Sequence, residues 1–415
     1  MKKIIRGMTF SLVLVISYFL LNNNGAVKSE KRDSNSILSF NICDSDGVNC
    51  SESTSVPIGS YVIDEEKTYC EGGGKVSAYN STLGTIKYTI KGNDECKIYF
   101  KKAITNLSEI ILAKESTKDY TSSQDGSIYR VVNQNGVRYE GKDPDNYVEY
   151  NGESWRIIGT FNGEDVGLET DKKYTKIIYD GELMSASWDC TDELLLDDGT
   201  CNYMMGDTSG TTNDWVNSSL HSYLNNNYLN NLSNESQGQI AKYNNNYSTW
   251  YLLGVVDAAT SYYASEWYDL ERSTGYIPYE IIIDANTGRE TESYFSPSVA
   301  SAIGLMYPSD YGYAAYGEQC NNESTETLDN YNVCGTLDWL VLTPFEGSEV
   351  ITEWTITPES LHSACAVGSS IYDGFLIYSG NDVTEVRVIR PTLYLAYDVE
   401  ITGGNGSKNN AFKVS

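Results

Sequence analysis

The C-terminal part of the chain constrains the fold most, because it lacks any long apolar period. Between Ile303 and Val399, aromatic residues, small residues and single charges alternate at short spacing. A helical bundle needs sustained apolar stripes, and a parallel sheet needs continuous apolar runs. The pattern therefore predicts short strands and irregular loops on a small scaffold.

Length and charge limit the class of protein. The chain has 415 residues, which exceeds the usual size of one domain and predicts two domains with a tail. Tyrosine is abundant, with 34 residues, and its hydroxyl suits sheets, loops and aromatic binding surfaces. The net charge of −28 repels phosphate backbones and anionic lipids alike. We therefore expect no nucleic-acid partner.

The N-terminus has the pattern of a secretion signal. A positive segment with Lys2, Lys3 and Arg6 precedes the apolar run from Met8 to Leu21, and polar residues follow. This run is shorter than the roughly 20 residues of a membrane-spanning helix, and it fits a signal peptide. We expect a signal over residues 1–27 and a secreted, extracellular or cell-surface protein. The chain would contact a membrane only through this segment, if it stays uncleaved.

The nine cysteines agree with export. None has the two-residue separation of a zinc knuckle, and most stand in pairs that close local loops. Such pairs are typical of disulfides in an oxidising compartment. Pairing by proximity predicts the disulfides Cys43–Cys50, Cys70–Cys96, Cys190–Cys201 and Cys320–Cys334. Cys365 remains, and we expect it to be a small buried thiol.

Changes in pattern along the chain predict the domain organisation. Residues 33–102 show strand-like alternation with glycine-rich breaks, which predicts a small all-β module stapled by disulfides. Residues 103–126 would be a helical and flexible connector, with Leu107, Ile110 and Ile111 at helical spacing. The second domain would extend over residues 127–415.

Three local patterns stand out in the second domain. Asn151-Gly152 between two strand-like segments predicts a tight hairpin, because both residues accept the positive φ of a two-residue turn. An apolar stripe predicts a helix over Asp214–Leu232, capped by Thr212 or Asn213. A second helix is expected over Ser296–Leu305, and the asparagine-rich run 225–246 is expected to be polar filler.

Several C-terminal segments carry a family resemblance. They are the stretch from Pro308 to Ala315, the tripeptide Glu353-Trp354-Thr355, and Arg390-Pro391. With the hairpin and the helix, they resemble a domain of unknown function in bacterial surface proteins. That domain is similar to the C-type-lectin-like fold and to its branch with formylglycine-generating enzyme. The resemblance implies an α+β, C-type-lectin-like C-terminal domain preceded by the stapled β module.

The same resemblance raises the alternative of an enzyme. The oxidase of that branch needs two neighbouring active-site cysteines, but only Cys365 follows Trp354 here. His362 lies three residues before Cys365, and a Cys–His pair can activate a thiolate. A cell-wall hydrolase would need a selected pair of carboxylates, and nothing selects one. We therefore expect no catalytic residues, with a cell-surface enzyme or a structural spacer as alternatives.

Calcium is the cofactor question that the sequence leaves open. The Ca²⁺-binding segments of sugar-binding C-type lectins do not stand in this chain. Carboxylate and amide oxygens in acidic loops are nevertheless suitable Ca²⁺ ligands. The two acidic loops contain Asp44, Ser45, Asp46 and Asn49, and Asp189, Asp192, Glu193, Asp197 and Asp198. We expect no cofactor, with Ca²⁺ as the alternative.

The favoured function is a surface binding or adhesion module. Flat aromatic side chains suit stacking on sugar rings or on the side chains of a protein partner. We expect the ligand surface at a tyrosine- and tryptophan-rich loop region, with a glycan or protein ligand. Its residues would be Tyr262, Tyr263, Trp267, Tyr268, Tyr276, Tyr311, Tyr313 and Tyr316. The alternative is that these tyrosines replace leucine in the core.

Overall fold

The computed structural model divides the chain into two compact units, Met1–Ile104 and Thr105–Ser415. The residues that the structure describes are 37–44, 47–58, 61–81, 83–89, 94–103, 105–114, 127–131, 136–190, 211–255, 264–315, 337–342, 350–359, 362–370 and 374–415. The expected signal over residues 1–27 lies outside them. Among these residues, no helix is long and apolar enough to cross a membrane.

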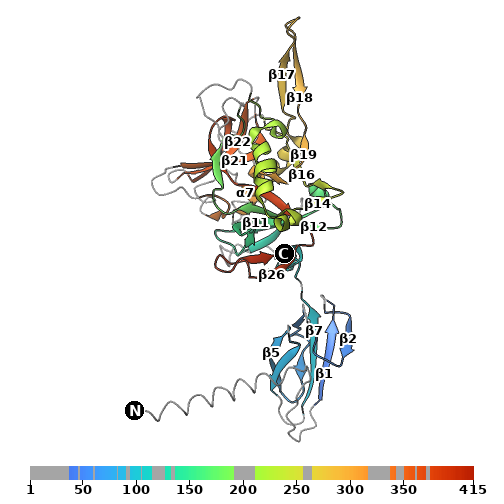
Figure 1. Ribbon diagram of the computed structural model, residues 1–415. Coiled ribbons are helices and arrows are strands. Elements are labelled where there is room, and N and C mark those ends of the chain that lie inside the picture. Colours follow the sequence, from blue (N-terminus) through green and yellow to red (C-terminus); the bar gives the residue numbers. More distant parts are fainter. Residues whose placement is uncertain are drawn as a thin grey trace, which may run out of the picture. The chain divides into compact units, whose positions relative to one another are not determined.

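The N-terminal unit is a small β module (Figure 1). Its strands are β1 (Ile37–Cys43), β2 (Cys50–Ser53), β3 (Tyr61–Ile63), β4 (Tyr69–Cys70), β5 (Lys75–Asn80), β6 (Thr85–Thr89) and β7 (Glu95–Lys102). One sheet has the order β2-β1-β7-β3, with β4 also paired to β7, and β5 and β6 form a separate hairpin. Alternate side chains of β7, such as Ile98 and Phe100, are buried in its core. These strands confirm the all-β module that the alternation over residues 33–102 predicted.

Two of the predicted disulfides lie in this unit and are confirmed. Cys43–Cys50 joins register partners on β1 and β2, and Cys70–Cys96 joins register partners on β4 and β7. Cys190 is also disulfide-bonded, but Cys201, Cys320 and Cys334 lie outside the described residues. Cys365 is free and buried, as predicted. Disulfides of this kind are typical of an oxidising extracellular environment.

The expected connector is in part a piece of the C-terminal unit. Helix α2 (Leu107–Ala113) begins at Asn106, whose side chain accepts a hydrogen bond from the Glu109 amide. Leu107 and Ile111 are buried in the main core of the C-terminal unit. The helical spacing was therefore informative, but it marks a core-facing helix and not a loose linker.

The C-terminal unit is mostly β and contains two main sheets (Figure 1). The larger has nine strands, with the order β20-β25-β12-β11-β10-β27-β26 and with β9 and β8 attached to β11. Its strands are β8 (Ser127–Val131), β9 (Gly136–Glu140), β10 (Tyr147–Tyr150), β11 (Glu153–Asn162), β12 (Lys173–Tyr179), β20 (Ile303–Gly304), β25 (Thr392–Leu395), β26 (Ile401–Gly403) and β27 (Phe412–Val414).

The second sheet has five strands in the order β13-β24-β21-β22-β23. Its strands are β13 (Met184–Ala186), β21 (Val350–Pro358), β22 (Ser363–Ser370), β23 (Gly374–Asp382) and β24 (Arg387–Ile389). Three two-stranded ribbons pair β14 (Lys242–Tyr243) with β15 (Asn246–Tyr247), β16 (Thr249–Tyr251) with β19 (Ser298–Ala300), and β17 (Tyr279–Ile283) with β18 (Glu290–Tyr294).

The helices of the C-terminal unit are short. After α2 they are η2 (Glu164–Val166), η3 (Trp215–Asn217), α3 (Ser219–Ser222), η4 (Tyr223–Tyr228), α4 (Leu229–Asn231), α5 (Asn234–Gln239), α6 (Ala264–Asp269), η5 (Leu270–Thr274) and α7 (Pro308–Ala314). The segments from η3 to α4 occupy the predicted helix, but Asp214 and Ser218 provide its caps. The predicted turn is confirmed as well, with φ of 56° at Asn151 and 74° at Gly152.

The helix expected over Ser296–Leu305 is wrong. Val299 pairs with Trp250 in the β16–β19 ribbon, and Ile303 pairs with Leu393 at the edge of the large sheet. The apolar spacing of this segment fits a helix, but backbone pairing with two strands distant in sequence decides its conformation.

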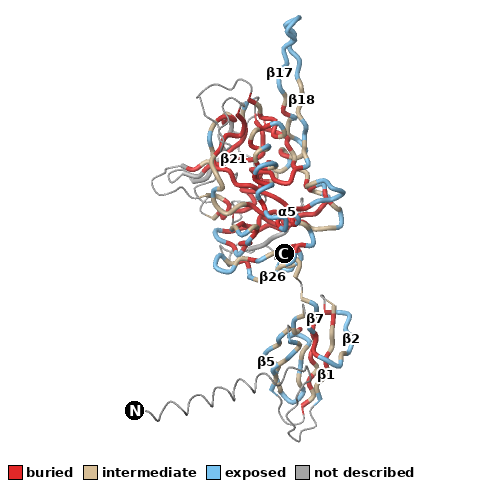
Figure 2. Tube along the Cα trace, in the orientation of Figure 1, coloured by how far each residue is buried: buried red, intermediate tan, exposed pale blue. Residues whose placement is uncertain are grey.

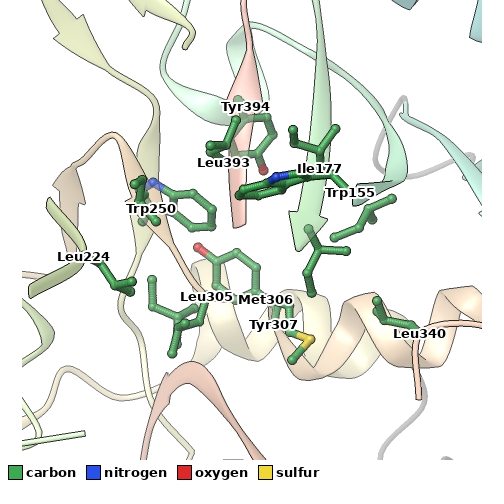
Figure 3. Packing of buried hydrophobic residues seen from close by; sticks show 14 of the residues in the cluster. Trp155, Ile177, Leu224, Trp250, Leu305, Met306, Tyr307, Leu340, Leu393 and Tyr394 are labelled. Atoms are coloured by element: carbon green, nitrogen blue, oxygen red, sulfur yellow. The ribbon is translucent and has the colours of Figure 1, made fainter. Parts of the chain in front are cut away.

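The core is built around tryptophan. All seven tryptophans of the chain are buried, and six of them are less than 2% exposed. Figure 3 shows Trp155 and Trp250 packed with Ile177, Leu393, Tyr394 and Tyr307. Trp155 packs edge-on against Tyr150 and Tyr179.

Candidate functional site

Most of the described aromatic residues that were expected to bind a ligand are not on the surface. Trp267, Tyr311 and Tyr313 are each 1% exposed, and Tyr268 and Tyr276 are partly buried. Tyr262, Tyr263 and Tyr316 lie outside the described residues. The expected aromatic loop surface is therefore wrong for Trp267, Tyr311 and Tyr313, and the alternative of a tyrosine-rich core holds for these positions.

Tyr311 is buried because it completes a charged network. Arg390 donates from Nε to Glu353 Oε1 at 2.8 Å and from Nη2 to the Tyr311 hydroxyl at 3.1 Å. Burial raises the pKa of Tyr311 well above its ordinary value, so the phenol stays neutral. Residues from segments 308–315, 353–355 and 390–391 thus meet here, in the core.

Trp267 is buried because α6 packs against α7. Behind α6, the Glu271 carboxylate accepts hydrogen bonds from the Ser309 amide at 2.8 Å and from the Ser309 hydroxyl at 2.6 Å. Within α7, Asp310 binds Arg138 at 2.7 Å and Lys176 at 2.6 Å. These buried ion pairs lock the helices onto the large sheet and leave little room for a ligand.

The β17–β18 hairpin is an exposed element of the C-terminal unit. It stands out from the body of the unit and is exposed along its length (Figures 1 and 2). The two strands pair only with one another among the described residues, so each presents an unpaired backbone edge. Free edges of this kind are sites where a strand from another chain can pair.

One face of the hairpin combines apolar and acidic side chains. Tyr279, Ile281 and Ile283 alternate along β17 and therefore point to the same side. Their register partners on β18 are Tyr294, Glu292 and Glu290. Ile281 and Ile283 are 46% and 61% exposed, and the rings of Tyr279 and Tyr294 lie 5.4 Å apart. An apolar row thus lies beside an acidic row.

A cleft of about 960 Å³ lies at the foot of the hairpin. One wall is formed by Glu280, Ile281 and the segment 293–296. The other described wall is formed by Asp189, Cys190, the segment 211–217 and His362. The cleft is large enough for a peptide segment or a sugar, and the hairpin face continues from it.

The carboxylates in the cleft organise its own wall. Asp189 accepts hydrogen bonds from the amides of Thr212 and Ser219, both at 2.8 Å, and burial raises its pKa. Asp214 accepts from the Val216 amide at 3.2 Å and from the Asn217 side chain at 2.5 Å. Their hydrogen bonds explain these positions without a metal.

The acidic loops weighed for calcium are described only in part. Asp192, Glu193, Asp197 and Asp198 lie outside the described residues, as do Ser45 and Asp46. Asp44 accepts hydrogen bonds from the Val48 amide and the Asn49 side chain, which closes a local turn. A carboxylate, Asp94, also lies beside Cys70 and Cys96, but these two sulfurs form a disulfide and cannot bind a metal as thiolates.

The Cys365–His362 alternative finds no geometric support. Cys365 is fully buried in β22, and burial raises the pKa of its thiol well above the ordinary value, so a thiolate is disfavoured. His362 is exposed, and its Nδ1 donates to the Thr211 carbonyl at 3.0 Å. This bond orients His362 toward the cleft wall.

The hairpin was not predicted from the sequence, although a signal for it exists. Isoleucines at 281–283 precede the turn residues 284–288, and alternating residues follow from Glu290 to Tyr294. Two strand-like runs around a short glycine-containing turn predict a hairpin. Asn225 was likewise taken as filler, but its side chain bonds both the amide and the carbonyl of Ile303.

Comparison with protein-family models, with curated proteins and with solved structures finds no match for this chain.

Proposed function

We propose that this protein is a secreted or surface-exposed binding module that holds a partner protein on its β17–β18 hairpin. The observation that carries the proposal is the hairpin face, where exposed Ile281 and Ile283 lie beside Glu290 and Glu292. A soluble protein rarely presents an apolar row on a protruding ribbon unless a partner covers it.

The pattern of the face defines the chemistry of the partner. The apolar row favours a partner with alternating apolar side chains, and the acidic row favours lysine or arginine between them. The unpaired edge of β17 favours a partner in extended conformation, bound through backbone hydrogen bonds. A second copy of this chain would bring glutamates against glutamates, so charge disfavours it.

The location of the protein and the fold class of its C-terminal unit are part of the same proposal. The disulfides and the N-terminal signal pattern support a location outside the cytoplasm. The short strands and short helices of the C-terminal unit support a C-type-lectin-like fold. In such a scaffold, loops and hairpins vary in sequence while the core keeps its packing.

A glycan in the cleft is the second candidate. The cleft wall places the aromatic residues Tyr294 and Phe295 opposite the polar side chains of Thr212 and Asn217. Sugars are commonly bound by aromatic faces together with hydrogen-bonding groups. In this case the cleft, and not the hairpin face, would determine affinity.

Two probes distinguish the candidates. The first is a pair of ten-residue peptides of equal composition, one alternating lysine and valine and the other carrying them in separate blocks. Equal charge cancels non-specific attraction to the acidic chain, so the proposal predicts clearly tighter binding of the alternating peptide. The second probe is a glycan array. Equal binding of the two peptides contradicts the proposal, and glycan binding that Tyr294→Ala abolishes would establish the second candidate.

A further inference from the structure

Asn162 and Lys173 face one another across the two central strands of the large sheet. Asn162 is the last residue of β11, Lys173 is the first residue of β12, and the two are register partners. Side chains of opposed residues in an antiparallel pair lie on the same face. The Lys173 Nζ donates a hydrogen bond to Asn162 Oδ1, so the amine lies beside the Asn162 carboxamide carbon.

A carboxyl group lies next to this pair. Asp165, on η2 in the β11–β12 loop, interacts with the Asn162 side chain and with the charge of Lys173. Its Oδ2 is buried and accepts no hydrogen bond from the described residues. Desolvation raises the pKa of Asp165, which makes it a better proton acceptor than an exposed aspartate. The Lys173 amine, the Asn162 carboxamide and the Asp165 carboxyl group, which can carry a proton, therefore lie next to one another.

We propose that Lys173 and Asn162 form an intramolecular amide bond, with Asp165 as the proton-transferring residue. Asp165 takes a proton from the Lys173 ammonium, and the neutral Nζ attacks the Asn162 Cγ. A bond forms between Nζ and Cγ, and the bond from Cγ to the amide nitrogen breaks. Nζ loses two protons in all, and Asp165 passes them in turn to the leaving nitrogen, which departs as ammonium and leaves Asp165 ionised again. The step needs no oxidant and no cofactor.

The buried ion pair between Lys176 and Asp310 lacks this chemistry. Lys176 contacts Asp310 at 2.6 Å, but Arg138 binds the second carboxylate oxygen of Asp310. The two cations hold the pKa of Asp310 well below its ordinary value, so the carboxylate stays ionised. An ionised carboxylate resists attack by an amine, whereas the Asn162 carboxamide is neutral.

The bond would close the β11–β12 connection covalently. It would join two strands in the middle of the sheet, between β25 and β10. Like a disulfide, it would restrict the unfolded chain, but reducing agents would leave it intact.

Peptide mass mapping of the reduced and alkylated full chain tests the proposal. Trypsin should yield the peptides 157–172 and 173–176 as one branched species, about 17 Da lighter than their sum through loss of ammonia. Lys173→Arg should give separate peptides of full mass. Lys172→Arg is the matched control, because it changes the neighbouring lysine and should keep the branched species. Full-mass, separate peptides from the wild-type chain would overturn the proposal.

A second loss of ammonia must be distinguished. Asn162 precedes Gly163, and an Asn-Gly step can cyclise to a succinimide with the same mass change. A succinimide leaves trypsin able to cut after Lys173, and it persists in Lys173→Arg. That result would overturn the proposal. Asp165→Ala should give a folded chain with unlinked peptides, and a linked Asp165→Ala chain would overturn the role of Asp165.

Discussion

The guanidinium of Arg390 donates from Nε to Glu353 Oε1 at 2.8 Å, and both side chains are only 4% exposed. Glu353 lies on β21, and Arg390 lies between β24 of the same sheet and β25 of the large sheet, so the pair lies where the chain passes from one main sheet to the other. The same guanidinium reaches the Tyr311 hydroxyl on α7. Residues from segments 308–315, 353–355 and 390–391 therefore hold the fold together in the core.

Removal of Arg390 should destabilise the C-terminal unit strongly. Arg390→Met leaves the Glu353 carboxylate buried without its cation, which costs about 3–5 kcal/mol in the free energy of unfolding. Arg289→Met, on the exposed hairpin, should change it by about 0.5 kcal/mol or less. Urea denaturation monitored by tryptophan fluorescence measures both variants. Similar losses in the two would mean that the Arg390 network is not a structural centre.

Trp267→Ala should also reduce the free energy of unfolding, by about 3–5 kcal/mol, because a fully buried tryptophan leaves a large cavity. Tyr243→Ala removes an aromatic side chain that is 42% exposed and should cost much less. Thermal melting followed by circular dichroism compares the two. An unchanged melting temperature in Trp267→Ala would mean that Trp267 is exposed and not part of the core.

The Cys365 thiol should be inaccessible in the folded chain. Its burial and raised pKa predict that an aromatic disulfide reagent reacts with it only after denaturation, and then with one thiol per chain if the other eight cysteines are paired. The absorbance of the released thiolate gives the count. Rapid reaction of Cys365 without denaturant would revive the Cys–His enzyme alternative.

His221 should make stability fall on mild acidification. Its Nε2 lies 2.9 Å from the Ser301 hydroxyl, and burial lowers its pKa below the ordinary value of about 6.5. Below that pH the unfolded chain takes up a proton that the folded chain resists, so unfolding becomes easier as pH decreases. Urea midpoints at about pH 7 and pH 5.5 should therefore differ less in His221→Gln than in the wild-type chain. Identical pH dependence in the two chains would exclude this role.

Local signals in the sequence predicted the parts of the fold that depend on local chemistry. Asn151-Gly152 requires positive φ, and the stripe from Val216 to Tyr228 shows its helical period directly. The segment at Val299 and Ile303 has helical spacing as well, but it pairs with β16 and β25. Such pairing depends on residues that are distant in sequence, and the apolar spacing within a segment does not show which distant strand it will pair with.

The candidate site was the least predictable part for the same reason. Whether a tyrosine is exposed depends on its neighbours in the folded chain. Nothing in the sequence around Tyr311 and Tyr313, which are buried, distinguishes them from Tyr294, which is exposed. Tyr294 is 60% exposed, because its strand extends away from the body of the unit. The disulfides Cys43–Cys50 and Cys70–Cys96 were predictable, since each closes a short loop.

The most direct test of the binding proposal is the affinity of the alternating lysine–valine peptide for two double variants, measured by isothermal titration at physiological salt. Ile281→Ser with Ile283→Ser removes the apolar row of the hairpin, whereas Val48→Ser with Leu83→Ser removes apolar groups that are at least as exposed from the N-terminal unit. The hairpin variant should bind at least about tenfold more weakly, which corresponds to about 1.4 kcal/mol. The control variant should bind like the wild-type chain, with unchanged melting temperatures throughout. Equal affinity of the hairpin variant and the wild-type chain would contradict the central claim.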